Sequence, residues 1–288
     1  MYSIIGVTGH VGGVAANLLM EKKQPVRAVL RNPAKRGEWE NKGAEVVIAE
    51  LHDAASLEAA FRNADGVFVM TPPLFDSNDP MADHNQMLDA LVTAIEKAKP
   101  GKVVYLSSVG AHLPTGTGAI KKLYDMEQAF GKLTVPTVSI RAAWFMENFA
   151  GTIPYTRNSG KLPSFLNPPA LSIPMVAAKD IGQLAASLLV EKWDGHRILE
   201  LSGPCSYSAD DVAYLLSFGL ERPVDAEAIS PEAYAKTYES FGFTVKASEL
   251  MAEMNNGFNS GHIVFEGAEC EQVEGDTFLE DAIRSYLS

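Results

Sequence analysis

The chain has 288 residues, of which 47% are hydrophobic, so it can bury one large core, or one large core and a small one. Its formal net charge is −12, and residues 151–288 carry 20 acidic against 9 basic side chains, a balance that argues against direct binding of nucleic acid. The two cysteines, Cys205 and Cys270, stand far apart and no two histidines are spaced H-x-x-x-H, which argues against a disulfide framework and leaves metal binding without support.

The chain opens with a predicted strand, a glycine-rich turn and a helix. Gly6, Gly9 and Gly12 remove side chains where a turn is tight, where backbone approaches a pyrophosphate, and where a helix packs closely on a strand. The positive end of the helix near Val11 would hold the diphosphate of a dinucleotide. The alternative is that the glycines only shape a turn. Because the first residues are already a strand and no apolar run approaches the length of a membrane span, we expect no signal peptide, no membrane contact and a cytosolic location.

The second predicted strand, Val26–Leu30, arrives where a βαβ unit places it, and Arg31 follows directly. Sites that prefer NAD usually carry an acid at this position for the adenosine ribose, whereas an arginine can pair with a 2′-phosphate. Arg31 therefore favours NADP(H). The nearby basic residues Lys35 and Arg36 favour it too, and the alternative for these two is a solvated basic turn.

A third predicted strand ends just before Glu50 and Leu51. Ligands of open α/β sheets bind at the carboxyl ends of strands, so both residues are placed to line the adenine site. Asp53 or Ser56 is the expected N-cap of the helix that follows.

The fourth predicted strand, Gly66–Met70, is apolar throughout, as a buried parallel strand should be. It exits through Thr71, Pro72 and Pro73, whose rigid backbone would form one wall of the cofactor cleft. The segment Leu74–Asp83 is polar and irregular, and we interpret it as a flap over the substrate.

A fifth strand, Lys102–Leu106, leads into Ser107 and Ser108, whose hydroxyls are candidates to face the nicotinamide or the substrate. The alternative is that a pair of serines simply ends the strand. A helix near residues 119–130 and a sixth strand, Pro136–Arg141, complete the regular alternation.

Beyond residue 150 prolines become frequent and the alternation stops. We therefore expect an α/β protein with a Rossmann-type, doubly wound parallel sheet in residues 1–150 and a smaller α+β substrate subdomain in residues 151–288, whose strands are free to interleave with the first part. The pieces expected in the second part are a helix after Asp180, a strand Arg197–Leu201, a helix capped by Ser208 or Asp210, and a final helix Phe278–Leu287. Residues 242–275 receive no chemical role and are interpreted as a lid or as packing.

Taken together, several short motifs resemble the NmrA-like, atypical branch of the short-chain dehydrogenase/reductase superfamily. The similarity runs through about residue 220 and is specific in combination. Its carriers are Gly6-x-x-Gly9-x-x-Gly12, Leu30-Arg31-Asn32-Pro33, Glu50-Leu51-x-Asp53-x-x-Ser56-Leu57, Ser107-Ser108, Val135-Pro136, Ile140-Arg141, Phe145-Met146-Glu147-Asn148-Phe149 and Asp180-Ile181.

The resemblance implies an NADP-binding Rossmann domain and a small C-terminal subdomain. It places the diphosphate on the glycine turn, the 2′-phosphate on Arg31, the adenine beside Glu50 and Leu51, and the ribose near residues 71–73. The nicotinamide would lie near the block that contains Asn148. The residues implied to hold the cofactor are Gly6, Thr8, Gly9, His10, Val11, Gly12, Arg31, Glu50, Leu51, Thr71, Pro72, Pro73, Ser107 and Asn148.

The chain departs from the superfamily in its proton donor. Reductases of this superfamily typically use Tyr-x-x-x-Lys, and no tyrosine here has a lysine four residues on. NmrA-like reductases often place a lysine four residues before the helix acid, and counting back from Glu127 that position is Leu123. Lys122 and Tyr124 are the only nearby substitutes. A one-residue shift should turn Lys122 about 100° around the helix, away from the cleft, unless the helix is locally distorted.

These observations favour an NADPH-dependent oxidoreductase that transfers hydride to a quinone-like or other conjugated acceptor, which can collect its proton from water. Quinone and triphenylmethane-dye reductases belong to the resembled family. The alternative is a non-catalytic NADP(H)-binding redox sensor that acts through a protein partner, and a weaker third class is a sugar-nucleotide or isoprenoid-type transformation on the same fold. The sequence leaves the acceptor and the oligomeric state open.

Overall fold

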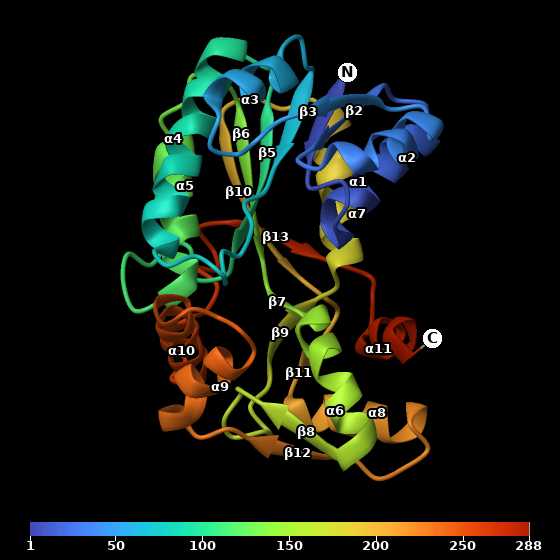
Figure 1. Cartoon of the computed structure of the whole chain (residues 1–288), viewed down its shortest axis with the longest axis vertical. Coiled ribbons are helices and arrows are strands. Elements are labelled where there is room, and N and C mark those ends of the chain that lie inside the picture. The colour runs from blue at the N-terminus through green and yellow to red at the C-terminus, as the bar shows by residue number, and fades with distance from the viewer. Residues whose placement is uncertain (288) are drawn as a thin grey trace.

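The computed structural model describes residues 1–287 and contains a parallel sheet of eight strands with helices on both faces (Figure 1). The strand order is β13-β10-β6-β5-β4-β1-β2-β3, and every neighbouring pair in it is parallel. This arrangement confirms the expected Rossmann-type, doubly wound sheet and extends it by two strands. The strands are β1 Tyr2–Ile5, β2 Val26–Leu30, β3 Glu45–Ile48, β4 Gly66–Val69, β5 Val103–Ser108, β6 Thr137–Ala142, β10 His196–Ser202 and β13 Glu271–Glu274.

Helices cover both faces of this sheet because each strand buries side chains on both sides. In β1, for example, Ile4 packs toward α1 and α7, whereas its neighbour Ile5 packs toward α3 and α4. Figure 1 shows α1, α2 and α7 on one side and α3, α4 and α5 on the other. Their bounds are α1 His10–Glu21, α2 Arg36–Asn41, α7 Ala178–Val190, α3 Ala54–Phe61, α4 Pro80–Ala98 and α5 Lys121–Phe130. None of the helices in residues 1–287 is both long and apolar enough to cross a membrane.

Side-chain caps set where several helices begin. Asp53 accepts from the amides of Ala55 and Ser56 and starts α3, as expected. Asp79 accepts from the amide of Ala82 and starts α4. The irregular segment predicted as Leu74–Asp83 therefore ends four residues early, because an aspartate cap followed by proline forms a helical first turn.

The sheet takes strands from beyond residue 150. After an insertion between β6 and α7, the chain returns to add β10 beside β6, and much later β13 beside β10. The helix predicted after Asp180 is α7. It packs against α1 on one face of the sheet and so does not belong to the second part. The eight-stranded sheet therefore contains strands from both sides of residue 150, so the boundary expected there is not an edge of the sheet.

The remaining residues form a smaller α+β part below the sheet in Figure 1. It holds a three-stranded sheet, β11-β9-β7, and a two-stranded sheet, β12-β8, around a separate apolar cluster. Its elements are β7 Trp144–Phe145, η3 Met146–Thr152, α6 Ile153–Ser159, β8 Lys161–Ser164, β9 Ile173–Val176, β11 Ser206–Tyr207, α8 Ala209–Gly219, β12 Asp225–Ala228, η4 Pro231–Ala233, α9 Tyr234–Ser240, α10 Val245–Asn259 and α11 Leu279–Leu287. Two further 3₁₀ turns lie outside this part, η1 Pro33–Lys35 before α2 and η2 Gly118–Ile120 before α5.

A buried arginine joins the two parts. Arg141, on β6, is 3% exposed and pairs with Glu127 of α5 at 2.8 Å and with Glu266 at 2.6 Å. Glu200, on β10, accepts from the amides of Glu266 and Gly267 and so holds the segment that follows α10. Because a buried charge must be paired, this cluster fixes the distal segment against the carboxyl ends of β6 and β10.

Candidate functional site

The predicted cofactor residues gather along one edge of the sheet. Because the strands are parallel, the carboxyl ends of β5, β4, β1, β2 and β3 lie in sequence along this edge. The residues expected to hold the cofactor stand at or just beyond those ends, in the order Ser107, Thr71 to Pro73, Gly6, Arg31, and Glu50 with Leu51. The fold thus brings distant segments into one row.

The three glycines of the first turn have different roles. Gly6 has φ +76°, a left-handed conformation that favours glycine. A Cβ on Gly12 would lie 2.5 Å from the Gly6 carbonyl oxygen, so α1 packs directly on the end of β1 only because that side chain is absent. Gly9 has φ −100° and a Cβ there would meet only the Gly6 oxygen, at 3.4 Å. The fold does not require glycine at position 9, and its bare backbone is open to a ligand.

The N-terminus of α1 is open in the same place. Gly9 is the N-cap and supplies no side-chain hydrogen bond, and no acidic residue stands in the first turn. The first amides of a helix have no intrahelical acceptor, so the amides of His10, Val11 and Gly12 can receive an anion. This geometry fits the diphosphate expected from the sequence.

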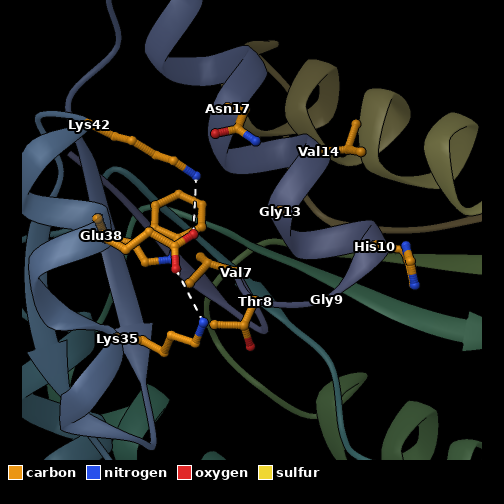
Figure 2. A pocket seen from close by; sticks show the side chains of 11 residues that line it. Val7, Thr8, Gly9, His10, Gly13, Val14, Asn17, Lys35, Glu38 and Lys42 are labelled. Atoms are coloured by element: carbon orange, nitrogen blue, oxygen red, sulfur yellow. Dashed lines mark hydrogen bonds and ion pairs between the residues drawn. The ribbon is translucent and has the colours of Figure 1, made fainter.

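A pocket of about 350 Å³ lies between this turn and α2 (Figure 2). Thr8, Gly9 and His10, all in the predicted set, line one side together with the first turns of α1. The facing wall comes from residues that the sequence analysis did not assign to a site, Lys35, Glu38, Trp39 and Lys42. In the sequence, the three charged residues among them alternate in sign at helical spacing. This pattern usually indicates only a solvated helix face, so it did not predict a site.

Lys35 lines this pocket, a position that favours a role in binding over the alternative of a solvated basic turn. Asn32 accepts from the amide of Ala34 and caps the 3₁₀ turn Pro33–Lys35, which presents Lys35 to the pocket. Arg36 follows that alternative instead, since it is exposed and pairs with Glu40 at 3.1 Å. Arg31 is exposed and has no hydrogen bond or ion pair within residues 1–287, so its guanidinium is available to a ligand.

Ser107 is already used inside the protein. Its side chain is 2% exposed, and its hydroxyl donates to Glu127 Oε1 at 2.6 Å. The same carboxylate oxygen accepts from Ser139 at 2.8 Å. The Ser107 hydroxyl is thus committed to the buried cluster of Arg141, whereas Asn148, on η3, is exposed.

Lys122 does not point away from the cleft wall, so the expected orientation is wrong. Its side chain is buried, and Nζ donates to the carbonyl oxygen of Pro73 at 3.1 Å. Lys122 lies in the first turn of α5, and its long side chain reaches the loop after β4 from there. Burial lowers the pKa of the Lys122 ammonium to about 8.

His84, on α4, is fully buried near Lys122. Burial and the charge of Lys122 lower the pKa of its imidazole to about 4, so the ring is neutral at pH 7. A hydrogen bond with the backbone of Lys122 acts in the opposite direction and does not offset this lowering. The buried ammonium that contacts the Pro73 carbonyl therefore has a neutral imidazole as its neighbour.

The other end of the loop after β4 is held by residues 243–246. Phe243 stacks on Phe75 with ring centroids 4.1 Å apart. Thr244 donates its amide to the Phe75 carbonyl oxygen at 3.0 Å and its hydroxyl to the Ser77 carbonyl oxygen at 2.5 Å. Lys246 pairs with Asp79 at 2.6 Å. The segment interpreted as a flap is thus fastened to part of residues 242–275, the stretch without an assigned role.

The chain is similar to known proteins over almost its whole length. The family model of the NmrA-like family matches residues 2–280. The chain is 26% identical over 254 residues to the NAD(P)H azoreductase of Xenophilus azovorans, covering 88% of this chain and 86% of that one. No group of three or more His, Cys, Asp or Glu in residues 1–287 is placed to hold a metal ion.

Two solved structures have the same fold. The NADPH-dependent quinone oxidoreductase of Escherichia coli, complexed with NADPH, superposes with a TM-score of 0.82 at 19% identity and covers 100% of both chains. The triphenylmethane reductase of Citrobacter sp., complexed with NADP(H), also has a TM-score of 0.82, at 18% identity and 99% coverage of both chains. The likeness spans the sheet and the second part alike.

We predict that the buried Lys122 gives the protein a stability that rises with pH. The pKa of Lys122 is about 8 in the folded chain against an ordinary 10.5, so above pH 8 the unfolded chain binds more protons at this position. The free energy of unfolding should then increase by about 2–3 kcal/mol between pH 8 and pH 10.5, and Lys122→Met should lack this increase. Urea unfolding of both proteins from pH 7 to pH 10 measures it, with Lys121→Met as the control. A stability difference between wild type and Lys122→Met that is constant with pH would contradict the prediction.

Proposed function

The chain belongs to the NmrA-like family, and from this we propose that it is an NADPH-dependent oxidoreductase that transfers hydride to a quinone-like or other conjugated acceptor. The observation that carries the proposal is the turn at Gly9, where bare backbone and the uncapped N-terminus of α1 face an open pocket. The names of the proteins reported above, an azoreductase, a quinone oxidoreductase and a triphenylmethane reductase, support this class of acceptor.

The residues present fit a dinucleotide phosphate. The amides of His10, Val11 and Gly12 would bind the diphosphate, and the missing side chain of Gly9 lets it approach. Arg31 would hold the 2′-phosphate. Lys35 and Thr8 line the pocket beside the glycine turn and would border the same end of the cofactor.

The remaining contacts follow from the order of the strand ends. Glu50 and Leu51, beyond β3, would border the adenine, and Thr71 to Pro73, beyond β4, would border the ribose nearer the nicotinamide. Asn148 is exposed on η3 and is proposed for the nicotinamide end. The hydroxyl of Ser107 does not fit this role, because it donates to Glu127.

The chemistry comes from the bound cofactor, which supplies a hydride to an electron-poor conjugated acceptor. The protein would bind and orient both molecules. No side chain is set up as the usual proton donor: Lys122 donates to the Pro73 carbonyl and position 123 is leucine. A reduced quinone or dye can take its proton from water, so this absence does not oppose the proposed reaction.

The alternative of a non-catalytic sensor is not favoured, because the azoreductase reported above and the quinone oxidoreductase 2 of Escherichia coli, which match over 88% and 91% of this chain, are named as enzymes that reduce small molecules. We also propose a cytosolic location, supported by two free thiols, Cys205 and Cys270, which suit a reducing compartment.

The proposal is tested by NADPH oxidation with a soluble benzoquinone, an azo dye and a triphenylmethane dye as acceptors. We expect turnover with at least one of them, and we expect Gly9→Val to abolish both NADPH binding and turnover while remaining folded. Valine accepts the extended backbone at position 9 without a clash, but its side chain would occupy the space of the diphosphate. Wild-type affinity for NADPH in Gly9→Val, checked by fluorescence titration and circular dichroism, would show that the turn is only structural.

Arg31 should make NADPH the preferred cofactor. A charge-assisted pair with the 2′-phosphate is worth about 1.5–3 kcal/mol, so Arg31→Ala should lose about tenfold or more of NADPH affinity and leave NADH affinity nearly unchanged. Arg36→Ala is the matched control, since Arg36 is close in sequence and pairs with Glu40 instead. Equal affinity of the wild type for the two cofactors would contradict this assignment.

Tyr124 should not act as the acid. Loss of a general acid costs about 10²–10⁴-fold in rate, whereas we expect Tyr124→Phe to keep quinone reduction within about threefold of wild type. The half-buried Tyr124 ring lies under the Lys121 ammonium, and the substitution removes only the hydroxyl. A hundredfold loss of kcat with NADPH affinity intact would restore a dedicated proton donor.

A further inference from the structure

A carboxylate stands between two lysines inside the pocket beside the glycine turn. Lys35 Nζ lies 3.5 Å from Glu38 Oε2, and Lys42 Nζ lies 3.5 Å from Glu38 Oε1. Figure 2 shows the two lysine side chains converging on Glu38 from either end of the pocket, with Thr8 on the facing wall. Ion pairs of this length between half-exposed side chains are weak, so the lysines can exchange Glu38 for another anion.

Packing does not explain why an acid occupies this position. On α2, only Trp39 is buried, and it anchors the helix to the core. Glu38 is 48% exposed, and so is Glu40 on the same helix, which pairs with Arg36 and does not line the pocket. The two acids are alike in exposure and in ion pairing, and they differ in whether their charge enters the pocket.

The charge of Glu38 acts against a phosphate. Without it, the pocket would present two ammonium groups to a 2′-phosphate. With it, the phosphate must compete for both lysines and must lie close to a carboxylate, which repels a dianion. A ribose with a free 2′-hydroxyl carries no charge at this position and meets no such repulsion.

We propose that Glu38 determines how strongly this chain discriminates between NADP(H) and NAD(H). By occupying Lys35 and Lys42, its carboxylate lowers the affinity for the 2′-phosphate and leaves the affinity for the unphosphorylated ribose unchanged. The preference that Arg31 creates is thereby reduced, and NADH remains a usable cofactor. The inference rests on the proposed function in one respect, since it requires that this pocket takes the 2′ side of the adenosine.

The test uses two nucleotides that differ only in the group concerned, 2′,5′-ADP and 5′-AMP, and measures their binding by calorimetry to wild type, Glu38→Gln and Glu40→Gln. A dianion and a carboxylate about 6 Å apart in screened water repel enough to change affinity by about three- to tenfold. We expect Glu38→Gln to bind 2′,5′-ADP about three- to tenfold more tightly and 5′-AMP within twofold of wild type. Glu40→Gln, which changes the net charge equally, should bind both within twofold, and the gain in Glu38→Gln should shrink in 0.5 M salt, roughly as Debye screening requires.

Two outcomes would overturn the inference about Glu38. One is an equal gain in Glu38→Gln and Glu40→Gln, which would reduce the effect to net charge. The other is an equal shift for 2′,5′-ADP and 5′-AMP, or no shift, in folded Glu38→Gln. If wild type binds 2′,5′-ADP and NADPH but Glu38→Gln changes nothing, only this inference fails. If wild type binds neither 2′,5′-ADP nor NADPH, the proposed function fails with it.

Discussion

The contact between α1 and β1 at Gly12 is the constraint from which the candidate site follows. A side chain at position 12 would collide with the backbone of Gly6 and Ile5, so the helix rests directly on the end of the strand. Gly182, on α7, allows a similar close contact between α7 and α1, because a Cβ at this position would lie 2.7 Å from the Val11 carbonyl oxygen. Strand, α1 and α7 are stacked by these backbone contacts, which aim the open amides of α1 at the edge where the strand ends meet.

A second constraint is electrostatic. Arg141 lies within the sheet layer and is surrounded by Glu127, Glu200 and Glu266, and a buried guanidinium of this kind tolerates little displacement of its partners. The cluster holds α5 on one side and the segment beyond α10 on the other, so the second part of the chain is positioned by groups in the sheet. It also takes up the hydroxyl hydrogen of Ser107, which donates to Glu127.

The loop after β4 links these two constraints to the proposed reaction. Pro73 is held by Lys122 of the sheet part, while Phe75 and Ser77 are held by Thr244 of the second part. The proposed wall of the cofactor cleft and the segment interpreted as a flap are therefore continuous in the chain, and this loop is held by the sheet part at one end and by the second part at the other.

Local patterns were enough to predict β1 to β6, the glycine turn and the cap at Asp53, because apolar periodicity, glycine spacing and side-chain caps act between residues close in the chain. The edge on which the cofactor residues gather follows from the parallel strand order that those elements imply. What tertiary structure alone decided were contacts between distant segments: Lys122 with Pro73, 49 residues apart, and Thr244 with Ser77, 167 apart. No periodicity or short motif encodes such pairings, since they depend on how separately formed helices and loops pack in space.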